Sequence, residues 1–185
     1  GKEVMKKTDG AVSYYAQANG SYYLVEPIKW IVLEDTGSEY ILIASDILDS
    51  GRPFNDVFTN VDWDKSSMRD WLNGTDDYDD ETGSKYSGTW NFYDKAFSES
   101  DRSFIVTTTN KTAKNEQFGS AGCPDTEDKV YLLSVEELNK YFITAADGKD
   151  TAKTLYPMGF ASAYAIKRGA TAGKHDEVSW WLRTA

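Results

Sequence analysis

Residues 128–138 read DKVYLLSVEEL, an apolar run that leads directly into a helix start. The apolar and aromatic side chains of residues 130–133 predict a short buried strand. Ser134, followed three residues later by Glu137, predicts a capping box, in which each side chain bonds a backbone N–H of the other residue. The segment therefore predicts a strand that passes into a helix running through Tyr141 and Phe142.

Similar local signals predict the elements on either side. Alternating apolar residues at 22–34 and 40–44 predict a hairpin that turns at Gly37-Ser38 and is interrupted at Pro27. Ser66 or Ser67 is expected to cap a short helix that ends at Asn73-Gly74. Further expected elements are a helix at 92–97, β-rich chain at 105–109, loops at 110–127 and 145–174, and a strand at 178–183. Apolar faces predict one core containing Trp30, Trp71, Leu133 and Trp180.

The length, composition and net charge of the chain exclude several classes of protein. The 185 residues suffice for one domain with a buried core, and the hydrophobic fraction of 40% excludes a disordered chain. Thirty acidic residues against 20 basic ones leave a net charge of −10, which argues against nucleic-acid partners. No apolar run is long enough for membrane insertion. We therefore expect residues 1–21 to be a lead-in segment and residues 22–185 to be one α+β domain with short twisted antiparallel sheets, two or three short helices and long loops.

A set of motifs in fixed order identifies a resemblance. In chain order they are Glu26–Trp30, Ile47–Asp49, Trp63 with Ser66, Met68–Asn73, Phe92–Ser98, Asp128–Ser134, Tyr164-Ala165 and Trp180–Arg183. This order resembles a family of uncharacterised domains in secreted and cell-surface proteins of gut-dwelling Gram-positive bacteria. That family is similar to the C-type-lectin-like fold of formylglycine-generating enzymes and sulfatase-modifying factors. The resemblance covers residues 22–185 and implies a C-type-lectin-like fold and a secreted or cell-surface location.

The resemblance also implies a final strand after the WWLR motif, which would pair with the first strand. Here the sequence ends at Ala185, so we expect an open sheet edge near residues 23–33 that another chain or segment could contact. Formylglycine-generating activity needs paired cysteines, and Cys123 is the single cysteine of the chain. We therefore expect no such activity and no cofactor, calcium excepted.

Candidate ligand-binding residues come from the aromatic motifs. In a strand, Trp181 and Arg183 would share a face. The indole ring could then stack on a flat ligand or a sugar, and the adjacent guanidinium group could donate paired hydrogen bonds to it. The alternative is that the Trp residues are core and that Arg183 bonds a buried carboxylate or carbonyl groups. Trp63 and Tyr164, from two other motifs, complete the candidate set.

Acidic residues supply a candidate calcium site. Asp125, Glu127 and Asp128 lie at the end of the expected loop 110–128, and hard cations prefer several carboxylate oxygens. The alternative is that Asp128 caps an element or pairs with a base.

Three functions remain open. The first is a noncatalytic extracellular binding module for a glycan or a protein, favoured because no nucleophile–base set appears. The second is a hydrolase of cell-wall or host glycans that uses paired carboxylates, either Asp62 with Asp64 or Asp125 with Asp128. The third is a structural spacer within a surface protein.

Overall fold

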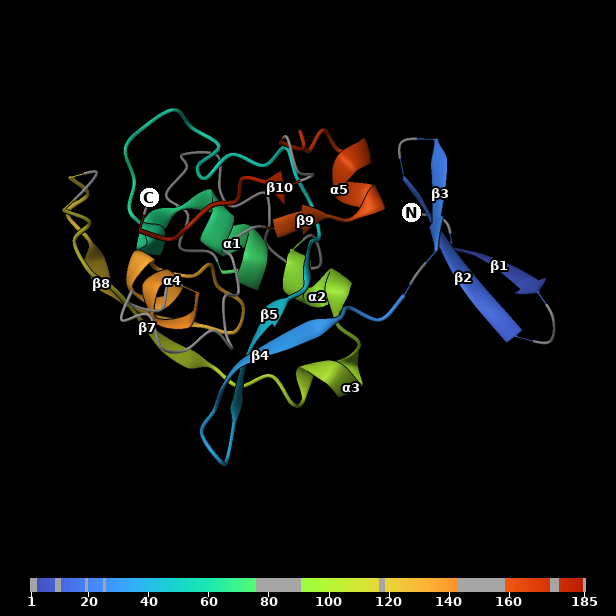
Figure 1. Cartoon of the computed structure of the whole chain (residues 1–185), viewed down its shortest axis with the longest axis horizontal. Coiled ribbons are helices and arrows are strands. Elements are labelled where there is room, and N and C mark those ends of the chain that lie inside the picture. Colours follow the sequence, from blue (N-terminus) through green and yellow to red (C-terminus); the bar gives the residue numbers. More distant parts are fainter. Residues whose placement is uncertain are drawn as a thin grey trace, which may run out of the picture. The chain divides into compact units, whose positions relative to one another are not determined.

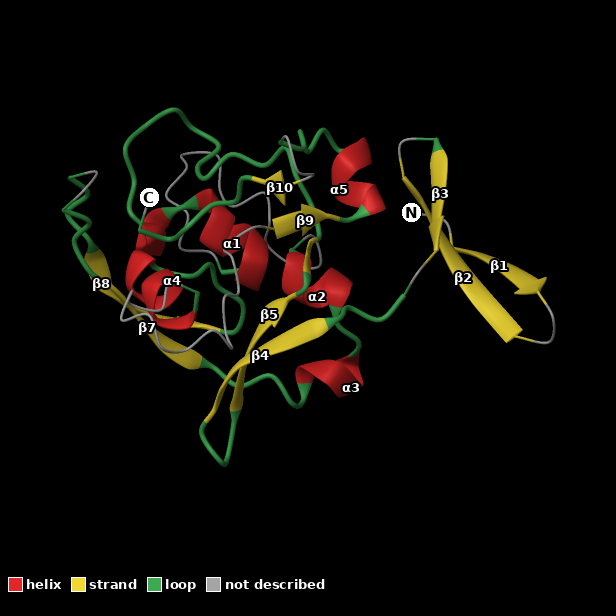
Figure 2. Ribbon diagram, in the orientation of Figure 1, coloured by secondary structure: helices red, strands yellow, loops and turns green. Residues whose placement is uncertain are grey.

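The computed structural model describes residues 3–8, 11–18, 20–24, 26–75, 91–116, 119–142, 159–173 and 177–184. Short, mostly antiparallel sheets, short helices and long loops confirm the expected α+β class (Figure 1, Figure 2). The described residues contain five α-helices, where the sequence predicts two or three. The chain divides into two compact units, residues 1–51 with 158–179 and residues 52–157 with 180–185.

The first unit begins with a three-stranded antiparallel sheet. Strands β1 (Glu3–Thr8), β2 (Ala11–Ala18) and β3 (Ser21–Leu24) follow one another in space as they do in sequence. The expected lead-in segment thus contains two complete strands. The expectation of a lead-in rests on residues 6–10, which show no apolar period, and backbone pairing between adjacent strands needs none.

The predicted hairpin is confirmed for residues 30–35 and 40–44, whereas residues 22–24 of the expected first strand lie in β3 and pair with β2. Strands β4 (Trp30–Asp35) and β5 (Tyr40–Ala44) pair antiparallel, with Val32 opposite Leu42 and a register shift between Val32 and Glu34. Gly37 has a φ of 84°, and its N–H donates to Asp35 Oδ1 at 2.8 Å, which explains the turn. Among the described residues β5 is the only strand paired with β4.

A second small sheet completes this unit. Strand β9 (Gly159–Ala161) pairs with β6 (Asp46–Ile47) in parallel and with β10 (Glu177–Val178) antiparallel. Helix α5 (Ala163–Lys167) follows and is capped by Ser162. The sequence predicts a loop over residues 145–174, because a strand of three residues and a helix of five are too short to show a period. Only Val178 of the predicted strand 178–183 lies in a strand, and residues 180–184 take irregular structure in the second unit.

The second unit holds the remaining elements. They are η1 (Trp63–Lys65), α1 (Ser67–Asn73), α2 (Phe92–Ala96), α3 (Glu99–Arg102), β7 (Thr108–Thr112), β8 (Cys123–Asp128) and α4 (Val135–Tyr141). Both bonds of the capping box predicted at Ser134 are present. Ser66 caps α1, and Gly74, with a φ of 69°, ends it. The local capping signals therefore predict these helices correctly.

Two predictions for this unit are wrong. Residues 110–127 are not one loop, because β7 and β8 form an antiparallel hairpin with Thr108 opposite Asp128. The buried positions of this hairpin are polar, including Asn110, Thr112 and Thr126, so no apolar alternation marks the strands. Residues 130–133 form no strand, although Leu133 is buried as expected.

The core of the second unit is built on η1 and α1. Trp63, Met68 and Leu72 are buried together, and the partly buried Phe54, Trp71, Phe92, Cys123, Val130, Tyr131 and Leu132 pack against them. The predicted shared core is wrong for Trp30, which is 40% exposed on the outer face of β4. Trp180 packs instead against Phe142, with ring centroids 6.4 Å apart. No helix among the described residues is long and apolar enough to cross a membrane.

Candidate functional site: an aromatic stack over a buried carboxylate

A buried carboxylate organises the second unit. Asp128 is 1% exposed, and its Oδ1 accepts from Arg69 Nε at 2.6 Å. Its Oδ2 accepts from Trp63 Nε1 at 3.0 Å, from Asn110 Nδ2 at 3.1 Å and from Thr126 Oγ1 at 2.7 Å. The donors come from η1, α1, β7 and β8, so one carboxylate ties four elements together. We call these five residues the Asp128 network.

The Asp128 network leaves the carboxylate fully engaged. Arg69 supplies the compensating charge, and its terminal nitrogens also donate to the carbonyl groups of Asp64 and Glu127. A buried charge is tolerated when it is paired and hydrogen-bonded in this way. Asp128 therefore pairs with a base, Arg69, which is the alternative to calcium binding considered for it from the sequence.

The candidate calcium ligands are not brought together. Alternation along β8 places Asp125 and Glu127 on the exposed side, whereas Asp128 points inward. Glu127 Oε1 accepts from Thr109 Oγ1 at 2.6 Å. Among the described residues no group of three or more His, Cys, Asp or Glu side chains could hold a metal ion. The same alternation separates Asp125 from Asp128, one of the two carboxylate pairs considered for hydrolysis.

Arg183 is also buried, with 3% of its surface exposed. Its Nη1 donates to the Glu137 carboxylate and to the Leu132 carbonyl, and its Nη2 donates to the Lys111 carbonyl at 3.1 Å. The guanidinium lies 5.5 Å from the centroid of the Tyr131 ring. This geometry corresponds to the alternative in which Arg183 bonds a carboxylate and carbonyl groups inside the protein.

Trp181 lies at the surface and is held from behind. The side chain is 46% exposed, and its Nε1 donates to the Arg52 carbonyl at 3.1 Å. Its ring centroid lies 5.9 Å from that of Phe54, which in turn lies 6.3 Å from that of the buried Trp63. Trp181, Phe54 and Trp63 thus form an aromatic stack that runs from the core to solvent. The indole hydrogen bond and the ring behind it fix the orientation of the exposed ring.

Arg52 links this stack to a second pair of rings. Its guanidinium carbon lies 3.9 Å from the centroid of the Trp71 ring, a cation–π contact. Trp71 packs on Phe92 with centroids 5.4 Å apart. Arg52 therefore contacts one Trp through its carbonyl group and another through its side chain. Sequence reasoning missed Arg52 and Phe54, because both lie in a loop without periodicity; the aromatic next to a proline at 53 is the only signal there.

The loop that follows Phe54 is hydrogen-bonded to the start of α1. Asn55 Oδ1 accepts from the Ser67 N–H at 3.2 Å, and Ser67 Oγ accepts from the Asp56 N–H at 2.8 Å. Asn55 Nδ2 also donates to the Val57 carbonyl at 2.9 Å. These hydrogen bonds hold the loop so that Val57 is 48% exposed and Phe58 is fully exposed. The second unit therefore presents apolar groups on a loop that is fixed by hydrogen bonds.

The candidate ligand-binding residues thus separate. Trp63 and Trp181 belong to one stack, but Trp63 is buried and only Trp181 can meet a ligand. Arg183 is engaged inside the protein. Tyr164 lies in the first unit, where its ring meets that of Tyr23 edge-on with centroids 5.3 Å apart.

Comparison with curated proteins and with solved structures gives no significant match. A family model does match, over residues 38–185, which span β5, the Asp128 network and the aromatic stack. The chain therefore belongs to the family described as a domain of unknown function, DUF6273.

Proposed function

We propose that this chain is a noncatalytic binding module and that Trp181 is its ligand platform. One observation carries the proposal: the ring is fixed by Phe54 and by the Arg52 carbonyl, yet 46% of the side chain is exposed. A large aromatic side chain normally buries most of its surface. Here two contacts, with Phe54 and with the Arg52 carbonyl, hold the Trp181 ring in a position where it is partly exposed to solvent.

The ligand that fits such a ring best is a glycan. The apolar C–H face of a sugar ring stacks on a flat indole, and a ring that is already immobile loses little entropy on binding. The Trp181 N–H is occupied by Arg52, so hydrogen bonds to sugar hydroxyls must come from neighbouring groups. The ring therefore supplies stacking alone.

The setting we propose is extracellular. The motif order resembles domains of secreted and cell-surface proteins of gut Gram-positive bacteria with a C-type-lectin-like fold, and a glycan-binding module suits that setting. A hydrolase that uses Asp125 with Asp128 is less well supported, because the buried Asp128 carboxylate accepts hydrogen bonds from four donors and lies on the opposite face of β8 from Asp125.

The test is a glycan array screened with the purified chain and with two variants. Trp181→Ala removes the platform, and Trp30→Ala is the matched control, because Trp30 is also an exposed indole but lies in the other unit. We expect Trp181→Ala to weaken binding about 30-fold, as for a typical aromatic hot spot. Trp30→Ala should bind glycans like the parent chain.

Two results would overturn the proposal. One is a parent chain that binds no glycan on the array, which would favour the spacer. The other is a Trp181→Ala variant that binds as tightly as the parent. The conservative Trp181→Phe variant, which keeps a ring, should retain part of the affinity, and melting temperatures should confirm that all variants are folded.

A further inference from the structure

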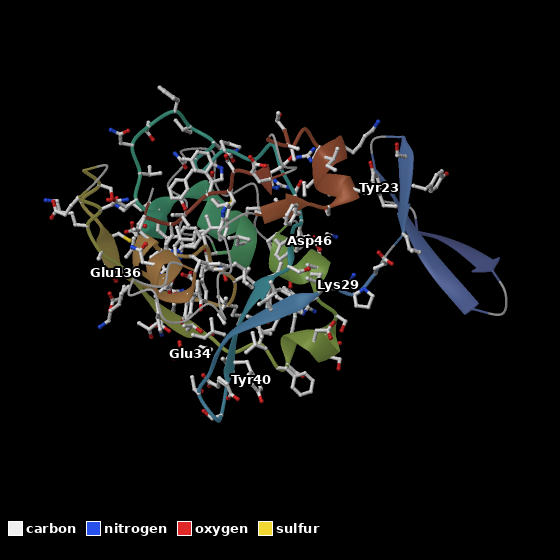
Figure 3. The ribbon with its side chains drawn as sticks, viewed as in Figure 1. Tyr23, Lys29, Glu34, Tyr40, Asp46 and Glu136 are labelled. Carbon is white, nitrogen blue, oxygen red and sulfur yellow. The ribbon has the colours of Figure 1, made fainter. Side chains whose placement is uncertain are left out.

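The hairpin β4–β5 carries a face of exposed apolar side chains. Trp30 and Val32 on β4 lie on the same face as Tyr40 and Leu42 on β5, as strand alternation requires. Their exposed fractions are 40%, 55%, 64% and 45%. We call these four residues the outer hairpin face. Figure 3 shows Tyr40 near the turn end of the hairpin.

The side chains on the opposite face of the hairpin are more buried. Ile31, Leu33, Ile41 and Ile43 alternate with the exposed residues and are all half-buried. An antiparallel sheet with one face on the core normally presents polar residues to water on the other. Contiguous exposed apolar residues are the usual mark of an interaction site, and single exposed apolar residues are not.

The size of the outer hairpin face limits what can cover it. Two half-exposed aromatic rings and two half-exposed aliphatic side chains present roughly 400 Å² of apolar surface. A stable interface between two folded chains needs about 800 Å² on each partner. A second copy held by this face alone is therefore too weakly bound, whereas a peptide segment has a suitable size.

The acidic residues beside the outer hairpin face indicate which charge the partner should carry. Asp35 and Glu39 lie exposed at the turn end of the hairpin, next to Tyr40. The chain carries a net charge of −10, so a second copy would bring further negative charge to this end. Basic side chains at one end of the partner would complement the two carboxylates.

We propose that the outer hairpin face binds a peptide segment of another protein, with apolar side chains in the middle and Lys or Arg at one end. The apolar side chains cover Leu42, Val32 and Trp30, and the basic end lies at Asp35 and Glu39. The site lies in the first unit and shares no residue with the Trp181 platform, so the two proposals can fail independently.

The test is a fluorescence-anisotropy titration of the full chain with two synthetic probes. One probe alternates Leu and Thr after an Arg-Arg-Gly start, and the other replaces both Arg residues by Glu. We expect the Arg probe to bind at least tenfold more tightly than the Glu probe. The Tyr40→Thr/Leu42→Thr variant should lose at least tenfold in affinity, since threonine keeps the strand propensity. Glu39→Gln, which leaves the apolar face intact, should weaken the Arg probe alone.

Two controls make the outcome specific. Phe104→Ser removes an apolar side chain that is 82% exposed in the second unit, and Trp181→Ala removes the glycan platform; both should bind the Arg probe as the parent does. The proposal is overturned if the parent chain binds neither probe up to about 1 mM, or if both probes bind equally. A dimer of the parent chain that Tyr40→Thr/Leu42→Thr dissociates would also overturn it, because the occupant would then be a second copy.

Discussion

Replacing Asp128 by Asn is expected to remove a large share of the stability of the second unit. The substitution keeps the size of the side chain but turns one oxygen into an N–H₂ group. That group then faces either Arg69 Nε or the donors of Trp63, Asn110 and Thr126, all of which now approach an oxygen within 3.1 Å. In either orientation a donor loses its acceptor, and the Arg69 charge loses its counter-charge.

The expected cost follows from the burial of the pair. Asp128 and Arg69 have side chains that are 0% and 8% exposed, so water cannot replace the lost partner. Removing one partner of such a pair costs about 3–5 kcal/mol. A chain of this size unfolds with a free energy of about 5–15 kcal/mol, so the loss is a large fraction of the total. The melting temperature should fall by roughly 6–20 °C.

Urea unfolding followed by tryptophan fluorescence measures this cost, and Asp125→Asn is the matched control. Asp125 is an exposed acid on the same strand, so its replacement should change the free energy of unfolding by no more than about 0.5 kcal/mol. Arg69→Met alone should also be strongly destabilising. The double variant Arg69→Met/Asp128→Asn should be less destabilised than the sum of the two, by about 1.5–3 kcal/mol. If Asp128→Asn costs less than about 1 kcal/mol, or if the two substitutions are additive, the Asp128 network does not organise the fold as argued.

Two further predictions concern single positions. Gly74→Ala should lower the free energy of unfolding in urea by about 2–4 kcal/mol, because a Cβ at a φ of 69° would lie 2.3 Å from Asn91 Nδ2. The control is Gly37→Ala, at a φ of 84° with nothing within 4 Å of the added Cβ, which should lower it by only about 1–2 kcal/mol. Equal losses at the two positions would show that crowding against Asn91 does not matter. Burial raises the pKa of the Cys123 thiol above its ordinary value of 9.0, so less thiolate is present at neutral pH. Iodoacetamide should therefore label the folded chain more slowly than the urea-unfolded chain near neutral pH, and equal rates in both states would contradict this.

The parts of the fold that the sequence predicts are those fixed by neighbours in the chain. Helices α1 and α4 are recognisable because Ser66 and Ser134 bond backbone groups three residues away, and Gly74 ends α1 in the left-handed region. The β4–β5 hairpin is recognisable for the same reason, since Gly37 closes its turn locally. Each of these signals lies within a few residues of the structure it specifies.

The parts that sequence reasoning misses are fixed by distant residues. Trp180–Arg183 alternates like a strand, but its conformation is set by bonds from Arg183 to Leu132 and Lys111 and from Trp181 to Arg52. Hairpin β7–β8 turns polar side chains inward to meet the Asp128 network, and buried polar residues give no apolar period. The exposure of Trp181 likewise depends on a loop that no local pattern marks.

Trp63 connects the stability of the second unit to the proposed binding surface. Its indole N–H donates to Asp128, and its ring packs against Phe54, which supports Trp181. A side chain that donates a hydrogen bond to a charge and packs against another ring has little freedom to turn. The Asp128 carboxylate is therefore linked to the exposed Trp181 ring through the rings of Trp63 and Phe54. The buried Asp128 carboxylate is therefore compatible with a rigid proposed platform. Its hydrogen bond orients the Trp63 ring, and the packing of Phe54 between Trp63 and Trp181 restricts the orientation of the Trp181 ring.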